Sequence, residues 1–199
     1  NKDNILLSEI NEEIIINNRK HKLELESFLY NTYPTLNLKY NGIEIIKSIV
    51  MPHKYNALVI SYKIYSDREA KIIIKPYVQS RDKEKINEAL NEYKQIPNKN
   101  TVVIKSNNLK TAVIIGSDKG KYIQDSAFDS KDYIEENYYN SKELVYNPGY
   151  FEYDIKKGMN KLNIIVVGDV EKKAYETFNN LYSIDNRYYE NFFNQETNR

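Results

Sequence analysis

Acidic side chains are the residues of this chain best suited to chemistry. Glu135 and Glu136 are adjacent, and Asp125 and Asp129 lie four residues apart in the same acidic, aromatic stretch. Glycoside hydrolysis needs one carboxyl group as general acid and a second as base or nucleophile, so these pairs are the local candidates. The chain holds 28 acidic residues, however, and adjacency among so many carries little information. We therefore expect a solvated surface and predict no catalytic residue in this chain; a small enzyme built on residues 125–136 is a less favoured hypothesis.

Metal and cofactor chemistry finds no support. His21 and His53 are the only histidines, and neither belongs to an HxH or HExxH pattern. The chain has no cysteine, which removes thiolate ligands and a thiol nucleophile. No GxxxxGK[ST] or GxGxxG phosphate-binding pattern and no GxSxG nucleophile elbow occurs. We expect no metal site and no cofactor.

An Arg81–Asp82 pair ends the segment 72–82, IIIKPYVQSRD. Its three consecutive isoleucines favour a β-strand, because β-branched side chains fit a pleated surface better than a helix. Pro76 has no backbone N–H, so this strand should lie at a sheet edge or be bulged there. The charged pair could orient a polar ligand, cap a following helix or tie down a loop. The last two roles are commoner and are favoured.

The composition excludes several classes of function. A length of 199 residues suits one domain or two small ones and is enough to build a real core. The formal charge of +1 argues against nucleic-acid binding, which requires a basic excess gathered in a patch. No apolar run approaches the roughly 18 residues of a membrane span, and the first residues lack a signal-peptide pattern. Together with the lack of cysteine, these features predict a cytoplasmic protein that binds neither nucleic acid nor membrane.

The elements that position these groups are mostly strands. Apolar runs at 5–7 and 14–16 flank the polar residues 11–13, which predicts a hairpin that turns there. Asn41-Gly42 is a strong type I′ turn signal between two alternating strands, because both residues tolerate positive φ. The strands that the pattern predicts after the first hairpin span residues 35–40, 43–51, 57–65, 72–82, 101–105, 111–115, 150–155 and 161–167.

Helical spacing occurs twice. Residues 82–93 carry a narrow apolar stripe, with Asp82 placed as N-cap. Residues 171–182 form a second amphipathic stretch, and an aromatic tail follows it. Asn147-Pro148-Gly149 predicts a turn before the strand at 150–155. The periodicity of residues 125–140 does not decide their structure.

Four segments, taken in order, resemble the N-terminal domain of prokaryotic glycogen debranching enzymes, the amylo-α-1,6-glucosidase family. Residues 4–12 are similar to the family's early LLSKLEE strand, and residues 43–62 to its leK.i.m…NT..v.Y hairpin. Residues 72–82 resemble its L.lrPlv..RD strand, and residues 138–158 its Y..E..RG…ed…PG.F…l..G segment. The matching positions are Lys47, Met51, Asn56, Tyr62, Pro76, Arg81, Asp82, Glu143, Pro148, Gly149, Phe151 and Gly158.

The departures from the family pattern are also informative. The family's usual opening, NGLGGY followed by RRYHGLL, is missing ahead of Asn1, and Leu144-Val145 replaces an Arg-Gly pair. The family's catalytic acids lie in a following (α/α) barrel, which nothing after Asp169 could encode. The resemblance therefore implies an excised domain whose first strands are truncated.

The resemblance implies a mainly β fold, a two-layer antiparallel β-sandwich of the supersandwich kind with a few helices. The sandwich would span residues 1–169, and residues 170–199 would form a helical linker toward the absent barrel. The implied role is non-catalytic: the domain braces the catalytic barrel of the same polypeptide and contacts an α-glucan such as glycogen.

Five residues at strand ends and loops are the expected contacts with glucan or barrel: Tyr77, Arg81, Asp82, Tyr150 and Phe151. An aromatic ring with a polar tip suits both sugar and protein interfaces. The alternative hypothesis is a free-standing carbohydrate-binding or adhesion module that uses exposed tyrosines as stacking platforms.

Overall fold

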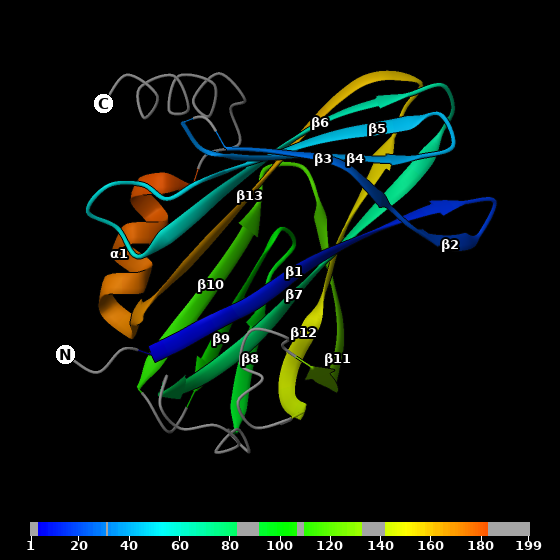
Figure 1. Cartoon of the computed structure of the whole chain (residues 1–199). Coiled ribbons are helices and arrows are strands. Elements are labelled where there is room, and N and C mark those ends of the chain that lie inside the picture. Colours follow the sequence, from blue (N-terminus) through cyan, green and yellow to red (C-terminus); the bar gives the residue numbers. More distant parts are fainter. Residues whose placement is uncertain (1–3, 31, 83–91, 107–109, 133–141, 183–199) are drawn as a thin grey trace.

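The computed structural model describes residues 4–30, 32–82, 92–106, 110–132 and 142–182, and omits the side chains of residues 4–5, 81–82, 132 and 142–143. The fold is mainly β, and its two antiparallel sheets form the predicted sandwich (Figure 1). One helix, α1 (Glu171–Leu181), follows the last strand.

The larger sheet has eight strands. Their order across the sheet is β3 (Glu24–Tyr30), β4 (Pro34–Tyr40), β5 (Ile43–Val50), β6 (Ala57–Ser66), β13 (Gly158–Val170), β10 (Thr111–Ser117), β9 (Thr101–Ser106) and β8 (Tyr93–Pro97). The β4–β5 connection is the predicted turn, with φ of 38° at Asn41 and 81° at Gly42. Both values suit a type I′ turn, which matches the twist of the flanking strands.

The smaller sheet has five strands. Their order is β11 (Lys121–Asp132), β12 (Lys142–Ile155), β7 (Ala70–Asp82), β1 (Asn4–Ile16) and β2 (Arg19–Lys22). Inward-facing residues of both sheets form one core, which includes Ile14, Ile45, Ile64, Ile72 and Val113. The two facing sheets are thus held together by alternate side chains of each strand.

A second apolar cluster lies on the outer face of the larger sheet, beneath α1. Ala174, Phe178 and Leu181 of the helix pack there against residues of β6, β10 and β13. At Gly116 an added Cβ would lie 2.5 Å from the Phe178 ring, so glycine permits the close approach. This confirms the predicted helix at 171–182; residues 183–199 lie outside the described part of the chain.

The first predicted hairpin is wrong, because β1 runs unbroken through residues 11–13. Glu12 and Glu13 can remain in the strand because their carboxylates pair with Lys47 of β5 and Lys75 of β7. The turn comes later, at Asn17 and Asn18, where φ is 51° and 60°.

The turn predicted at 147–149 is also wrong, because β12 continues through it as a bulge. The pairings Tyr146–Val78 and Phe151–Ile74 leave four residues of β12 opposite three of β7. This bulge lies opposite Pro76, in a strand flanked by β12 and β1. The sequence predicts an edge strand or a bulge at Pro76: β7 is not an edge strand, and its pairing is irregular at Pro76 through an extra residue on β12.

The helix predicted at 82–93 falls mainly on residues 83–91, which lie outside the described part of the chain. Its two ends are in strands, with Asp82 in β7 and Tyr93 in β8. In the undecided stretch, β11 extends to Asp132.

Candidate functional site

The outer face of the smaller sheet brings together two of the predicted contact residues. Along β7, Ile72, Ile74 and Val78 face the core, so alternation places Tyr77 on the opposite face. On β12, Phe151 and Ile155 face the core, which places Tyr150 outward. Tyr77 and Tyr150 therefore lie on one face, on adjacent strands.

Tyr77 is covered by its neighbours. The ammonium of Lys131 lies 4.1 Å from the centre of its ring, within range of a cation–π interaction. Lys131 also pairs with Glu9 at 3.1 Å. Tyr77 is only 5% exposed, so a ligand cannot reach its ring, which instead packs under Lys131. Tyr150 is half-buried, and part of its side chain is accessible.

Ion pairs follow the same outer face. Lys71 lies 3.1 Å from Glu152, and Lys75 lies 2.9 Å from Glu13. The side chains of both pairs are half-buried, at 22–33% exposure, so water reaches this charged sheet face only in part. The face offers lysine donors and carboxylate acceptors beside the Tyr150 ring, a set of groups able to bind hydroxyls.

Phe151 points into the core, on the other side of β12. It is 1% exposed, and its ring centroid lies 5.3 Å from that of Tyr122. Gly149 enables this reversal of face at the bulge: its φ is +139°, and a Cβ there would lie 2.2 Å from the Ile123 carbonyl oxygen. The PG.F residues of the family pattern thus have a packing role in this chain.

Arg81 and Asp82 form the last two residues of β7, opposite Ile5 and Asn4 of β1. Their side chains are not described, and residues 83–91 follow them. Helix capping, loop anchoring and ligand contact therefore all stay predictions for this pair.

An aromatic cluster, which the sequence did not predict, joins the edges of the two sheets. The Tyr93 ring of β8 stacks on Tyr146 of β12, with centroids 4.6 Å apart and planes at 7°. Phe128 of β11 lies 5.2 Å from Tyr146. The Gln95 amide donates to the Tyr146 hydroxyl at 3.0 Å. The sequence indicated an aromatic stretch around Phe128, but nothing local pairs it with Tyr93 on another sheet.

The hydroxyl of Tyr122 completes this cluster. It lies 2.8 Å from Oε1 of Gln95 and 2.6 Å from the Pro148 carbonyl oxygen, and its single proton can serve one of them at a time. Burial raises the pKa of both Tyr122 and Tyr146, so both stay protonated at neutral pH. The cluster can stack and hydrogen-bond, but it cannot supply a base.

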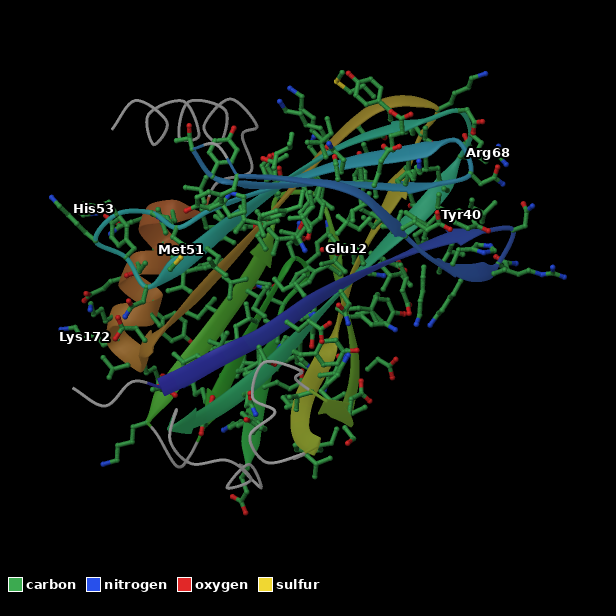
Figure 2. All side chains as sticks on the ribbon, in the orientation of Figure 1. Glu12, Tyr40, Met51, His53, Arg68 and Lys172 are labelled. Atoms are coloured by element: carbon green, nitrogen blue, oxygen red, sulfur yellow. The ribbon has the colours of Figure 1, made fainter. Side chains whose placement is uncertain are left out.

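The residues first considered for chemistry are dispersed. Tyr40 hydrogen-bonds Nδ1 of His21 at 2.7 Å, and Figure 2 shows Tyr40 and His53 at opposite ends of the molecule. Asp125 is exposed and Asp129 is half-buried, while Glu135 and Glu136 lie outside the described residues. Within the described ranges, no three histidine or acidic side chains gather as a metal site. No helix in these ranges is long and apolar enough to cross a membrane.

Comparison with solved structures finds one that shares the fold at low sequence identity, and others with a weaker likeness. A bacterial glucoamylase complexed with acarbose aligns with 97% of this chain and 31% of its own, at 12% identity and a TM-score of 0.58. The heparan sulfate lyase HepC from Pedobacter heparinus aligns with 80% of this chain and 24% of its own, at 14% identity and a TM-score of 0.48. The chain thus spans less than a third of each of these proteins.

No curated protein matches the chain significantly. The sequence model of one family, described as glycogen debranching enzyme N terminal, matches residues 1–162. Of the thirteen strands in the described part of the chain, that match includes twelve in full, together with the bulge and its Pro148-Gly149 pair. The chain belongs to the family of N-terminal domains of glycogen debranching enzymes.

Proposed function

We propose that this chain is the non-catalytic N-terminal domain of a bacterial, cytoplasmic glycogen-debranching glycoside hydrolase. In this role it braces a catalytic barrel of the same polypeptide and contacts the α-glucan substrate. The observation that carries the proposal is the family match over residues 1–162. The glucoamylase supports it, because the shared fold makes up 31% of that longer chain.

The chemistry of the described residues is consistent with a supporting role. Several carboxylates on the outer face of the smaller sheet, including Glu9, Glu13 and Glu152, pair with lysines. A glycosidase needs two carboxyl groups facing one sugar ring at a fixed separation. Structural ion pairs of this kind are not free for that work, and we expect no hydrolysis by the chain alone.

Exposed apolar side chains on β3 support the bracing role. Phe28 is 56% exposed and Tyr30 is 69% exposed, although the β3–β4 register puts both on the inner face of the larger sheet, opposite Leu36 and Pro34. The smaller sheet ends at the short strand β2, which leaves these side chains uncovered. Exposed apolar patches mark sites of association, and we propose that the barrel covers this one.

Glucan contact is proposed for the outer face of the smaller sheet. Tyr150 supplies the accessible ring, and Tyr77 and Phe151 support the two strands beneath it. Arg81 and Asp82 would add polar contacts from the end of β7. A pyranose ring stacked on Tyr150 would have the neighbouring lysines and carboxylates within reach of its hydroxyls.

Titration of the chain with glycogen tests this contact. Tyr150→Ala should weaken binding strongly, and Tyr77→Ala should weaken it by removing the support for Lys131. Tyr65→Ala is the matched control, because Tyr65 is 45% exposed but lies on β6 of the other sheet. If the Tyr150 and control variants bind equally, this face is not the glucan site. If the unmodified chain does not bind at all, the bracing role alone is left.

A further inference from the structure

A buried ionic cluster connects the two sheets. One carboxylate oxygen of Glu12, on β1, lies 2.6 Å from Nζ of Lys47 and accepts a hydrogen bond of 2.7 Å from the Tyr62 hydroxyl. The side chains of Glu12 and Lys47 are each 9% exposed, and Tyr62 is fully buried. Figure 2 shows Glu12 between the two layers of the sandwich.

The two partners of Glu12 are held in place by the larger sheet. Lys47 and Tyr62 are directly opposite each other on β5 and β6. Lys47 also donates to the Ile10 carbonyl oxygen of β1 at 3.4 Å. The larger sheet therefore presents a fixed cation and a fixed hydroxyl at one point, and only an anion on β1 can satisfy both.

Hydrophobic pattern alone leaves the register of β1 undecided. Its residues 14–16 are three isoleucines, and so are residues 72–74 of β7. The observed register pairs Ile14 with Ile72 and Glu12 with Ile74. A slip of one residue is excluded, because it would turn Asn11 toward the core. A slip of two residues would keep isoleucines facing the core and would be tolerated by the apolar pattern.

The ionic cluster distinguishes the observed register from those slipped by two residues. In either slipped register Ile10 or Ile14 takes the place of Glu12, and Lys47 stays buried without an anion. Removing one partner of a buried ion pair is strongly unfavourable, whereas an apolar replacement of the whole pair is often tolerated.

We propose that the Glu12–Lys47–Tyr62 cluster sets the register of β1, and with it the alignment of the β1–β2 hairpin in the smaller sheet. The cluster acts as a specificity device: it selects one of several strand alignments that bury similar apolar surface. A single buried polar contact plays a comparable role where it fixes the register of a coiled coil.

Disulfide trapping can read the register directly, because the chain has no cysteine. Ile15 and Lys71 are opposite each other in the observed register, so Ile15→Cys with Lys71→Cys should cross-link efficiently. Ile15→Cys with Glu69→Cys, and Ile15→Cys with Ile73→Cys, report slips of two residues in the two directions.

Each pair is then placed in three backgrounds, with circular dichroism as a check of folding. Lys47→Met, and the apolar triple Glu12→Leu, Lys47→Met and Tyr62→Phe, should lose native cross-linking and gain a slipped cross-link. The control Glu13→Gln with Lys75→Met, on the outer face, should keep the native cross-link only. Native cross-linking alone in a folded triple variant would overturn the proposal.

If the other variants do not fold, the charge-swapped variant Glu12→Lys with Lys47→Glu tests whether the ion pair sets the register of β1. It preserves one cation and one anion at the same two positions, so it should restore native cross-linking. A swapped variant that does not regain the native cross-link contradicts a register-setting role for the pair.

Discussion

The hydroxyl oxygen of Tyr122 lies 2.6 Å from the carbonyl oxygen of Pro148, across the bulge that interrupts the β12–β7 pairing. This contact connects β11 to the point at which β12 reverses the face of its side chains. It therefore helps to decide which of Tyr150 and Phe151 faces outward, and so which ring a glucan could reach.

Tyr122→Phe should destabilise the domain by about 1–3 kcal/mol, because it removes the one hydroxyl proton that the buried Pro148 carbonyl and the Gln95 amide oxygen share. Urea unfolding measures the change. Tyr65→Phe is the control: that hydroxyl is on an exposed side chain, and its removal should change stability by less than about 0.5 kcal/mol. Equal effects of the two substitutions would show that the Tyr122 contact does not hold the bulge.

Gly149→Ala should destabilise the domain more than Gly158→Ala. Both glycines have positive φ, at 139° and 98°, which costs a residue with a Cβ about 1–3 kcal/mol. At Gly149 the Cβ would also lie 2.2 Å from the Ile123 carbonyl oxygen, whereas at Gly158 nothing lies within 4 Å. The difference between the unfolding midpoints of the two variants measures the cost of the clash with the Ile123 carbonyl. Similar midpoints would contradict such a cost.

Deprotonation of Asp118 should lower the free energy of unfolding as pH rises from the acid range toward neutrality. Its carboxylate accepts bonds of 2.7 Å from the backbone N–H and the side-chain amide of Asn163. Burial nevertheless raises the pKa of this carboxyl group above its ordinary value, against the opposing effect of those bonds. The folded chain thus keeps the proton to higher pH than the unfolded chain. The stability from this group is full below the ordinary pKa and is lost as pH rises through the raised one.

The test compares Asp118→Asn with the unmodified chain between about pH 4 and about pH 7. The difference in free energy of unfolding should move in favour of the variant as pH rises. A difference that stays constant, or moves toward the unmodified chain, contradicts the raised pKa.

Substitution of the exposed β3 residues should matter only in the whole enzyme. Phe28→Ser should leave the isolated chain within about 0.5 kcal/mol of its original stability, because the ring is more than half exposed. If the barrel covers β3 as proposed, the same change in the whole enzyme should place a polar group in that interface and lower the thermal midpoint of unfolding. Tyr65→Ser, on the other sheet surface, is the control. If Phe28→Ser has the same effect on the isolated chain and on the whole enzyme, β3 is not part of the interface.

Sequence alone predicted those elements whose signals are local. Asn41 and Gly42 specify their turn by backbone preference, and the helix at 171–182 follows from its own apolar stripe. By contrast, the local pattern predicts a hairpin within β1, because the polar residues 11–13 separate two apolar runs. The partner of Glu12, Lys47, is 35 residues away in sequence, and only the assembled sandwich shows why a carboxylate can remain in that strand.

The features of the candidate site divide in the same way: those with a local sequence signal can be predicted, and those that depend on contacts between distant strands cannot. Pro148-Gly149 has the chemistry of a turn, but its bulged conformation depends on Tyr122 and Ile123 of the neighbouring strand. Tyr150 was expected as a contact, and its half-exposed ring is compatible with that role. The aromatic cluster of Tyr93, Phe128 and Tyr146 depends on two sheet edges meeting, which no spacing within one strand can reveal.

The measurement that tests the central proposal most directly is glucose release from a limit dextrin. It compares this chain, the separately produced catalytic part of the parent enzyme, and the two mixed. The account predicts no release by this chain, weak or short-lived release by the catalytic part, and greater release by the mixture. Glucose release by this chain alone, or a catalytic part whose activity and lifetime do not change on mixing, would contradict it.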